Sequence, residues 1–126
     1  MKYFFITGEE SGSNYATQII LNLKNIDNQA TFYGLGGSNM QAVGCGIILP
    51  LEKLAFMGFS DVVKNIFTIK NNIAQTKAAI LSIQPDVVCL VDYAGFNLRM
   101  AKWCKKNGFK VVYYILPKVW AWNEKE

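Results

Sequence analysis

Short apolar runs alternate along the chain with longer segments in which apolar residues recur at helical spacing. The runs predict strands at residues 2–7, 31–35, 86–91 and 110–115, and a further short strand at 47–49 that Pro50 ends. The longer segments predict a helix capped by Ser13 or Asn14, a short helix at 38–43, a mostly helical stretch at 54–81 that Pro85 ends, and a helix closed by Gly108. We expect this alternation to form an open parallel sheet with helices on both faces.

Sheets of this kind bind ligands beyond the carboxyl ends of their strands. The first such end is the glycine-rich turn Gly8-Glu9-Glu10-Ser11-Gly12-Ser13, whose backbone amides would favour an anion at the start of a helix. Two glutamates within the turn oppose that, and the spacing fits neither a dinucleotide fingerprint nor a P-loop. A carboxylate here either accepts hydrogen bonds from sugar hydroxyls or lies exposed in a tight turn.

Asp92 directly follows the apolar run at 86–91. A carboxylate at that point is partly removed from water, which favours its use as a base. It could equally accept hydrogen bonds from loop amides or cap the next helix, and Asn97 could cap that helix or meet a ligand. The sequence contains no histidine, so a general base near neutral pH has to be a carboxylate, a lysine, a tyrosine or a thiolate.

Composition narrows the possible functions. The 3 cysteines are widely spaced, with no CxxC pair and no histidine, which argues against zinc and favours reduced structural thiols. The sequence has no apolar run long enough to span a membrane and no signal-peptide pattern, so we expect a cytoplasmic protein. The net charge is +4, and the basic residues Arg99, Lys102, Lys105, Lys106 and Lys110 follow one another without an acid between them. Such a patch suits phosphate groups, an anionic membrane or nucleic acid, or it is a solvated helix face.

A lysine-flanked segment is unusually apolar, with Phe56, Met57, Phe59, Ile66, Phe67 and Ile69 close together. Core packing is one interpretation. The other, which the two phenylalanines around Met57-Gly58 favour, is a surface that dips into a bilayer or holds acyl chains.

Five motifs occur in the order and spacing of one known family: GEESG, FYGLGGSNMQAVG, LEKLAFMGFSDVV, PDVVCLVDYAGFNLRMA and PKVWAWN. Through them the chain resembles the lipid-A-disaccharide synthase family from Lys2 to its last residues. The resemblance implies an α/β fold with a Rossmann-like, doubly wound parallel sheet, the N-terminal half of a two-domain glycosyltransferase-B-type enzyme. It implies transfer of diacylglucosamine from UDP-2,3-diacylglucosamine to the 6-hydroxyl of 2,3-diacylglucosamine 1-phosphate (lipid X) in lipid A biosynthesis. The reaction would take place at the inner face of the bacterial inner membrane, without a metal ion or another cofactor.

Matched position by position, the resemblance implies that Asp92 is the base that deprotonates the acceptor hydroxyl. It implies substrate-binding roles for Glu9, Ser11, Gly12, Asn97, Trp120 and Trp122. It also implies that Phe56, Met57, Phe59, Ile66, Phe67 and Ile69 contact the membrane or acyl chains. Ser13, Ala94 and Leu116 stand where the family usually has an acidic residue, a proline and a serine.

The sequence stops a few residues after its last predicted strand, at VWAWNEKE. We therefore expect residues 1–126 to form the acceptor-binding domain without the C-terminal domain that binds UDP-sugar. Such a chain would be inactive alone, because both halves are needed to hold donor against acceptor. The expected partners are UDP-2,3-diacylglucosamine, lipid X, the inner-membrane surface and the missing domain, and nucleic acid is not expected. The alternative is a single-domain flavodoxin-like binding or signalling module, in which the two glutamates and Asp92 form an acidic pocket.

Overall fold

A computed structural model describes residues 1–54 and 62–115 of the chain. Its strands are β1 (Lys2–Ile6), β2 (Thr31–Gly36), β3 (Cys45–Pro50), β4 (Val87–Val91) and β5 (Val111–Tyr114). Its helices are α1 (Glu10–Ile26), α2 (Ser38–Ala42), α3 (Val62–Ile83) and α4 (Ala94–Lys106), and a short 3₁₀ turn, η1 (Leu51–Lys53), follows β3. Strands and helices thus alternate as the sequence predicts.

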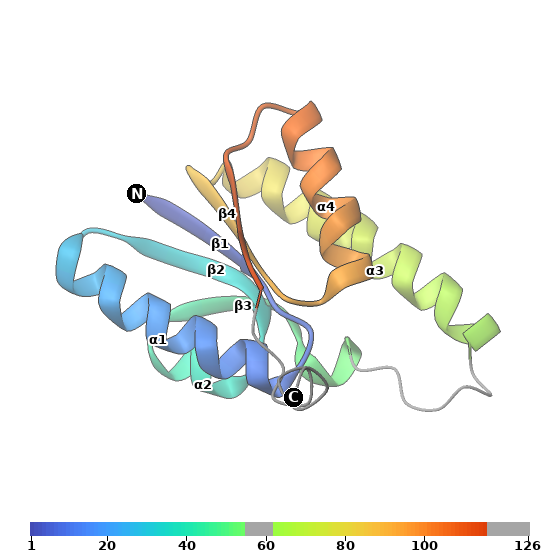
Figure 1. Cartoon of the computed structure of the whole chain (residues 1–126), viewed down its shortest axis with the longest axis horizontal. Coiled ribbons are helices and arrows are strands. Elements are labelled where there is room, and N and C mark those ends of the chain that lie inside the picture. Colours follow the sequence, from blue (N-terminus) through green and yellow to red (C-terminus); the bar gives the residue numbers. More distant parts are fainter. Residues whose placement is uncertain (55–61, 116–126) are drawn as a thin grey trace, which may run out of the picture.

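The strands form one parallel sheet in the order β3-β2-β1-β4-β5. Helices α1 and α2 cover one face of the sheet, and α3 and α4 cover the other (Figure 1). The expected α/β, Rossmann-like doubly wound architecture is therefore confirmed. The strand order reverses between β1 and β4, and the crevice beyond their carboxyl ends is the usual ligand site of such a sheet.

The start of α1 differs from the sequence prediction. The helix begins at Glu10, and the N-cap residue is Glu9, whose side chain makes no capping hydrogen bond. Ser13 already lies inside the helix, since its amide donates to the Glu9 carbonyl at 3.0 Å. The predicted cap at Ser13 or Asn14 is therefore wrong, because the glycine-rich residues assigned to a turn form the first turn of the helix.

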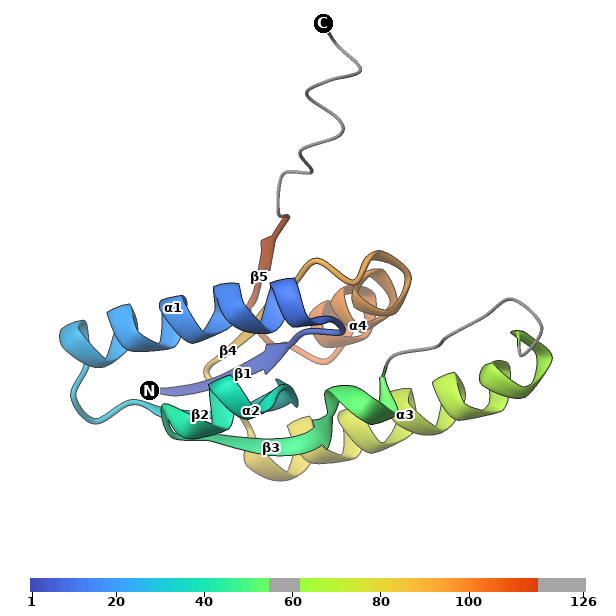
Figure 2. The same ribbon diagram turned by 90° about the horizontal axis from the view of Figure 1, so that it is seen from below.

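The ends of α3 and α4 agree with the prediction. α3 ends at Ile83, and the next residue, Gln84, has a positive φ of 53° before Pro85. α4 ends at Lys106 and is followed by Gly108 with a φ of 81°, a conformation that glycine adopts without a steric penalty. The first turns of α3 extend past the edge of the sheet in both ribbon views (Figure 2). Residues 55–61 of the predicted helical stretch lie outside the described residues.

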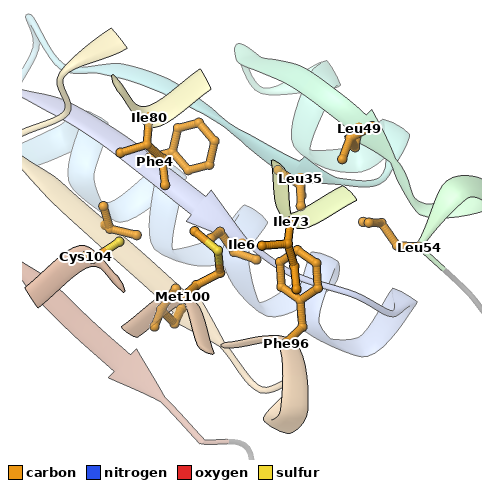
Figure 3. Packing of buried hydrophobic residues seen from close by; sticks show 12 residues of the cluster. Phe4, Ile6, Leu35, Leu49, Leu54, Ile73, Ile80, Phe96, Met100 and Cys104 are labelled. Carbon is orange, nitrogen blue, oxygen red and sulfur yellow. The ribbon is translucent and has the colours of Figure 1, made fainter. Parts of the chain in front are cut away.

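Two apolar clusters fill the spaces between the sheet and its helices, and successive residues of β1 point to opposite clusters. Phe4 and Ile6 face α3 and α4, as Figure 3 shows, whereas Phe5 faces α1. Every residue of β4 is buried, as expected for a central parallel strand with helices on both faces. The centre of the sheet is therefore closed to water on both faces, and polar chemistry there is left to the loops at the strand ends.

The cysteines Cys45, Cys89 and Cys104 are free thiols, and all are buried. Burial raises the pKa of Cys89 to about 12 and that of Cys104 to about 11, because the interior disfavours a thiolate. The thiols are therefore protonated near neutral pH, which agrees with the expected structural role. No helix among residues 1–54 and 62–115 is both long and apolar enough to cross a membrane.

The contact between β1 and β2 yields a test of the packing. A Cβ on Gly34 would lie 2.1 Å from the carbonyl oxygen of Phe5, whereas a Cβ on Gly95 in α4 would meet nothing within 4 Å. Gly34→Ala should lower the free energy of unfolding by at least about 1–3 kcal/mol, because the backbones of β1 and β2 must move apart at this point. Gly95→Ala should leave it unchanged or raise it by about 0.5–1 kcal/mol. Urea unfolding followed by circular dichroism would measure both, and equal stability of the two variants would contradict the described strand packing.

Candidate functional site

The loops that follow β1 and β4 touch at the point where the strand order reverses. Gly8 lies directly against the ring of Tyr93, since a Cβ on Gly8 would be 2.3 Å from the Tyr93 Cδ1 atom. The Tyr93 ring stacks on Phe96 with the ring centroids 4.9 Å apart, and its hydroxyl donates to the Leu54 carbonyl at 3.1 Å. Burial raises the pKa of Tyr93 to about 12, so the hydroxyl stays protonated near neutral pH and acts as a donor rather than a base.

Asp92 begins the loop after β4 in a strained backbone conformation. Its φ is 50° and that of Tyr93 is 57°, two consecutive left-handed residues neither of which is glycine. The Asp92 amide donates to the Tyr114 carbonyl at 2.8 Å, and the Tyr113 hydroxyl donates to the Asp92 carbonyl at 3.2 Å. Desolvation, and then the nearby charge of Asp92, raise the pKa of Tyr113. The strand end thus holds Asp92 through its backbone and keeps a protonated phenol beside it.

Asn97 ties the two strand ends together from within the protein. Its side chain is 0% exposed, and its Nδ2 donates to the Asp92 carbonyl at 2.6 Å. Longer contacts of 3.3 and 3.4 Å join the same amide to the carbonyls of Ile6 and Val91. The Oδ1 atom of Asn97 is buried without a hydrogen-bond partner among the described residues. The side chain therefore fixes the turn that carries Asp92.

The first turn of α1 covers the same strand ends. Glu9 and Ser11 are exposed there, and Gly12 is buried. A Cβ on Gly12 would lie 3.5 Å from the Cβ of Thr7 and 3.6 Å from the Cγ1 of Val91, so the helix packs closely on β1 and β4. Glu9 and Ser11 thus lie exposed at the carboxyl end of β1, where the chain enters α1.

Ser13 connects the loops that follow β1 and β2. Its hydroxyl accepts from the Gly37 amide at 3.0 Å and donates to the Oδ1 of Asn39, and the Asn39 side-chain amide donates to Asn14. The resemblance described in the sequence analysis implies an acidic residue at the position of Ser13. The hydroxyl makes one bond as an acceptor and one as a donor, and an ionised carboxylate could make only the first.

An apolar pocket of about 470 Å³ opens between α3 and α4, next to the loop of Asp92. Figure 3 shows two of its lining residues, Ile73 of α3 and Phe96 of α4, side by side. The full lining is Ile66, Ile69, Lys70, Ile73, Tyr93, Gly95, Phe96 and Arg99. Because Tyr93 belongs to both the pocket and the turn at Asp92, the two features form one continuous site.

Ile66 and Ile69, predicted as acyl contacts, line this pocket, whereas Phe67 does not and is 73% exposed. Other predicted site residues lie outside the described part of the chain, namely Phe56, Met57, Phe59, Trp120 and Trp122. Among the described residues no three His, Cys, Asp or Glu side chains gather in a way that could hold a metal ion.

The sequence prediction did not include Tyr93, Gly95 or Phe96 among the site residues. The signal was present in Asp92-Tyr93-Ala94-Gly95-Phe96, where two aromatic residues directly follow the carboxylate at a strand end. Their pairing with Gly8 could not be read from the sequence, because it depends on β1 and β4 lying side by side.

The fold and the site together define a Rossmann-like domain with an acidic residue and an apolar pocket at its ligand-binding edge. Residues 3–126 match the family model described as Lipid-A-disaccharide synthetase. The lipid-A-disaccharide synthase of Trichlorobacter lovleyi is 35% identical over 123 residues, which cover 98% of this chain and 32% of that protein. That of Coxiella burnetii (strain RSA 331) is 35% identical over 118 residues, covering 94% of this chain and 31% of that protein.

Lipid-A-disaccharide synthase 1 of Legionella pneumophila (strain Philadelphia 1) is likewise 35% identical, over 121 residues that cover 95% of this chain and 32% of that protein. The chain therefore belongs to the lipid-A-disaccharide synthase family. It spans about a third of the length of these curated relatives.

The buried amide of Asn97 can be tested against an exposed asparagine at the end of the same helix. Asn97→Ala removes the donor to the Asp92 carbonyl, and we expect a loss of about 2–3 kcal/mol of unfolding free energy because buried carbonyls lose a partner. Asn107, whose Nδ2 donates to the Trp103 carbonyl at 2.8 Å in an exposed position, should lose about 0.5 kcal/mol or less as Asn107→Ala. Thermal and urea unfolding would compare the variants. A similar loss in both would show that Asn97 does not hold the turn.

Proposed function

We propose that this chain forms the acceptor-binding part of a lipid-A-disaccharide synthase. The reaction would transfer diacylglucosamine from UDP-2,3-diacylglucosamine to the 6-hydroxyl of lipid X, releasing UDP. Family membership supports this assignment, and the observation that carries it is the apolar pocket that adjoins the turn of Asp92. A diacylated sugar needs an apolar cavity for a chain and a proton acceptor for its hydroxyl, and these features lie together here.

In this proposal Asp92 is the general base. The 6-hydroxyl oxygen attacks the anomeric carbon of the donor, its proton passes to the Asp92 carboxylate, and UDP leaves with the electron pair of the broken bond. A positioned base of this kind contributes about 10²- to 10⁴-fold to the rate. Tyr93 does not compete for the role, since its pKa is raised to about 12, and the sequence has no histidine.

Asn97 and Tyr93 would act as positioning residues. The amide of Asn97 holds the Asp92 carbonyl at 2.6 Å, and the ring of Tyr93 is fixed by Gly8, by Phe96 and by the Leu54 carbonyl. Both support a rigid turn, and a general base works best when it is held at a fixed place.

The lipid part of the acceptor would enter the pocket between α3 and α4. Ile66 and Ile69 supply its apolar wall, and Lys70 and Arg99 lie on its lining where they could meet the sugar phosphate. Phe67, 73% exposed on the same stretch of α3, would rest in the bilayer together with Phe56, Met57 and Phe59. The protein would then work as a peripheral enzyme on the cytoplasmic face of the inner membrane.

Five further residues would contribute to the cleft. Glu9, Ser11 and Gly12 would contact the sugar from the β1 side, and Trp120 and Trp122 would complete the cleft. The curated relatives are about three times as long as this chain, and we propose that the UDP-sugar is bound by their additional part. The chain alone should therefore bind acceptor without turning it over.

The acceptor site can be tested by NMR with diacylglucosamine 1-phosphate labelled with carbon-13 at C6. Binding to the chain should shift the C6 signal, because the hydroxyl it carries meets Asp92. In Asp92→Asn this shift should shrink, while amide shifts around Ile69 and Phe96 persist because the pocket is intact. UDP should produce little response.

The matched control is Asp86→Asn. Asp86 directly precedes β4, at the amino-terminal ends of the strands, and its side chain accepts a hydrogen bond from the Lys2 amide at 2.7 Å. An amide oxygen can still accept that bond, so the C6 shift should equal that of the wild type. If Asp92→Asn gave the wild-type C6 shift, the assignment of Asp92 as base would be overturned. If the folded chain ignored the lipid, the acceptor role itself would fail.

The acyl pocket can be tested independently of Asp92. Ile69→Ser places a hydroxyl in the apolar wall and should weaken acceptor binding about tenfold, the loss expected for about 1.5 kcal/mol of apolar contact. Ile19→Ser alters a similarly half-buried isoleucine of α1 on the other face of the sheet, and should change affinity less than about twofold. Calorimetric titration would measure both. Equal affinities in the two variants would place the acyl chain elsewhere.

A further inference from the structure

Gly95 is a glycine that neither the backbone nor the packing of the described residues requires. Its φ is not positive, unlike that of Gly108, and a Cβ there would meet nothing within 4 Å, whereas one on Gly8 or Gly34 would collide with a neighbour. Gly95 lies in the first turn of α4, and glycine within a helix is less stable than alanine. What the missing side chain leaves is open space, and that space adjoins the apolar pocket, which Gly95 lines.

The walls around this space are fixed. On the α4 side the Tyr93 ring stacks on Phe96 with the centroids 4.9 Å apart, and its hydroxyl is bonded to the Leu54 carbonyl. On the α3 side the exposed fraction of the lining isoleucines falls from 45% at Ile66 to 8% at Ile73, so the pocket deepens along that helix. A ligand therefore meets a cavity whose dimensions are set by packed side chains.

The apolar stretch of the pocket along α3 is short. Ile66 and Ile73 are separated by two helical turns, about 10 Å at a rise of about 1.5 Å per residue. Beyond Ile73 the lining becomes cationic, with Lys77, Lys102 and Lys105 along the adjoining groove. An apolar chain laid there would remove ammonium groups from water, which is unfavourable. The straight path for such a chain thus ends near Ile73, and a longer chain needs room to the side.

The volume and lining of the pocket suit one unbranched hydrocarbon chain. The cavity of about 470 Å³ lies toward the lower end of the range of about 300–1,000 Å³ that is usual for ligand pockets. Isoleucine side chains and aromatic rings make up most of its lining, and the Tyr93 hydroxyl is already engaged. That the hydrocarbon chain is an acyl group of the acceptor rests on the proposed function.

We propose that Gly95 is a specificity-determining residue, and that its missing side chain sets the length of the acyl chain that the pocket accepts. A short chain would occupy the straight stretch beside α3, and the end of a longer chain would turn into the space in front of Gly95. A larger side chain at this position would fill the space and leave room for the short chain alone.

The test compares acceptors of two chain lengths by calorimetric titration, using didecanoyl and ditetradecanoyl glucosamine 1-phosphate. The wild type should bind the longer lipid more tightly, by about fourfold for each methylene that it buries in addition. Gly95→Leu should weaken binding of the longer lipid about 15-fold, because leucine would displace about two methylenes, and should weaken binding of the shorter lipid less than about twofold. Gly95→Ala, which adds one carbon, should give an intermediate loss for the longer lipid.

The matched control is Ala94→Leu. Ala94 is the neighbouring residue of the same helical turn and is exposed like Gly95, but it does not line the pocket. Both affinities should therefore stay within about twofold of the wild type. Urea unfolding would show that the variants are folded, as expected for a side chain that enters open space.

Three outcomes would overturn the proposal. The first is wild-type affinity of Gly95→Leu for the longer lipid, and the second is an equal loss for both lipids, which would show no selection of length. The third is the same selective loss in Ala94→Leu. The proposed function fails separately: Gly95→Leu would still separate the two lipids, while the C6 signal of the labelled acceptor would not respond to Asp92→Asn.

Discussion

The site depends on the close contact between Gly8 and the ring of Tyr93. Only a residue without a side chain allows the loop after β1 to lie flat against an aromatic ring that follows β4. The ring in turn packs on Phe96 and donates to the carbonyl of Leu54, which follows β3 and η1. Three loops from different parts of the chain thus meet at one side chain. A shift of that ring would disturb the turn of Asp92, the wall of the pocket and the crevice together.

Much of the fold could be predicted from the sequence because the periodicity is local. The run at 86–91 is apolar because β4 is covered on both faces, and Pro85 and Gly108 mark helix ends through their own backbone preferences. The start of α1 could not be predicted in the same way. Glycine and serine are typical of turns and caps, and tertiary packing on β1 and β4 makes Gly12 part of a helix instead.

The candidate site could be predicted only in part. The position of Asp92 at a strand end is a local feature, and it places the carboxylate at the ligand-binding edge of any parallel sheet. The pairing of Gly8 with Tyr93 and the burial of the Asn97 amide depend on which strands are neighbours, which a single sequence does not reveal. The apolar pocket required the relative placement of α3 and α4, since its residues are shared between them. The resemblance implies an acidic residue in place of Ser13, and in the structure the Ser13 hydroxyl links the loops that follow β1 and β2.

The bond from Asn97 to the Ile6 carbonyl joins residues 91 positions apart. β1 gains its second neighbour only when β4 pairs with it, and closing so long a loop of chain costs entropy. A ligand that occupies the crevice beyond β1 and β4 would hold the two halves of the sheet together. It would raise the free energy of unfolding in proportion to the logarithm of its concentration.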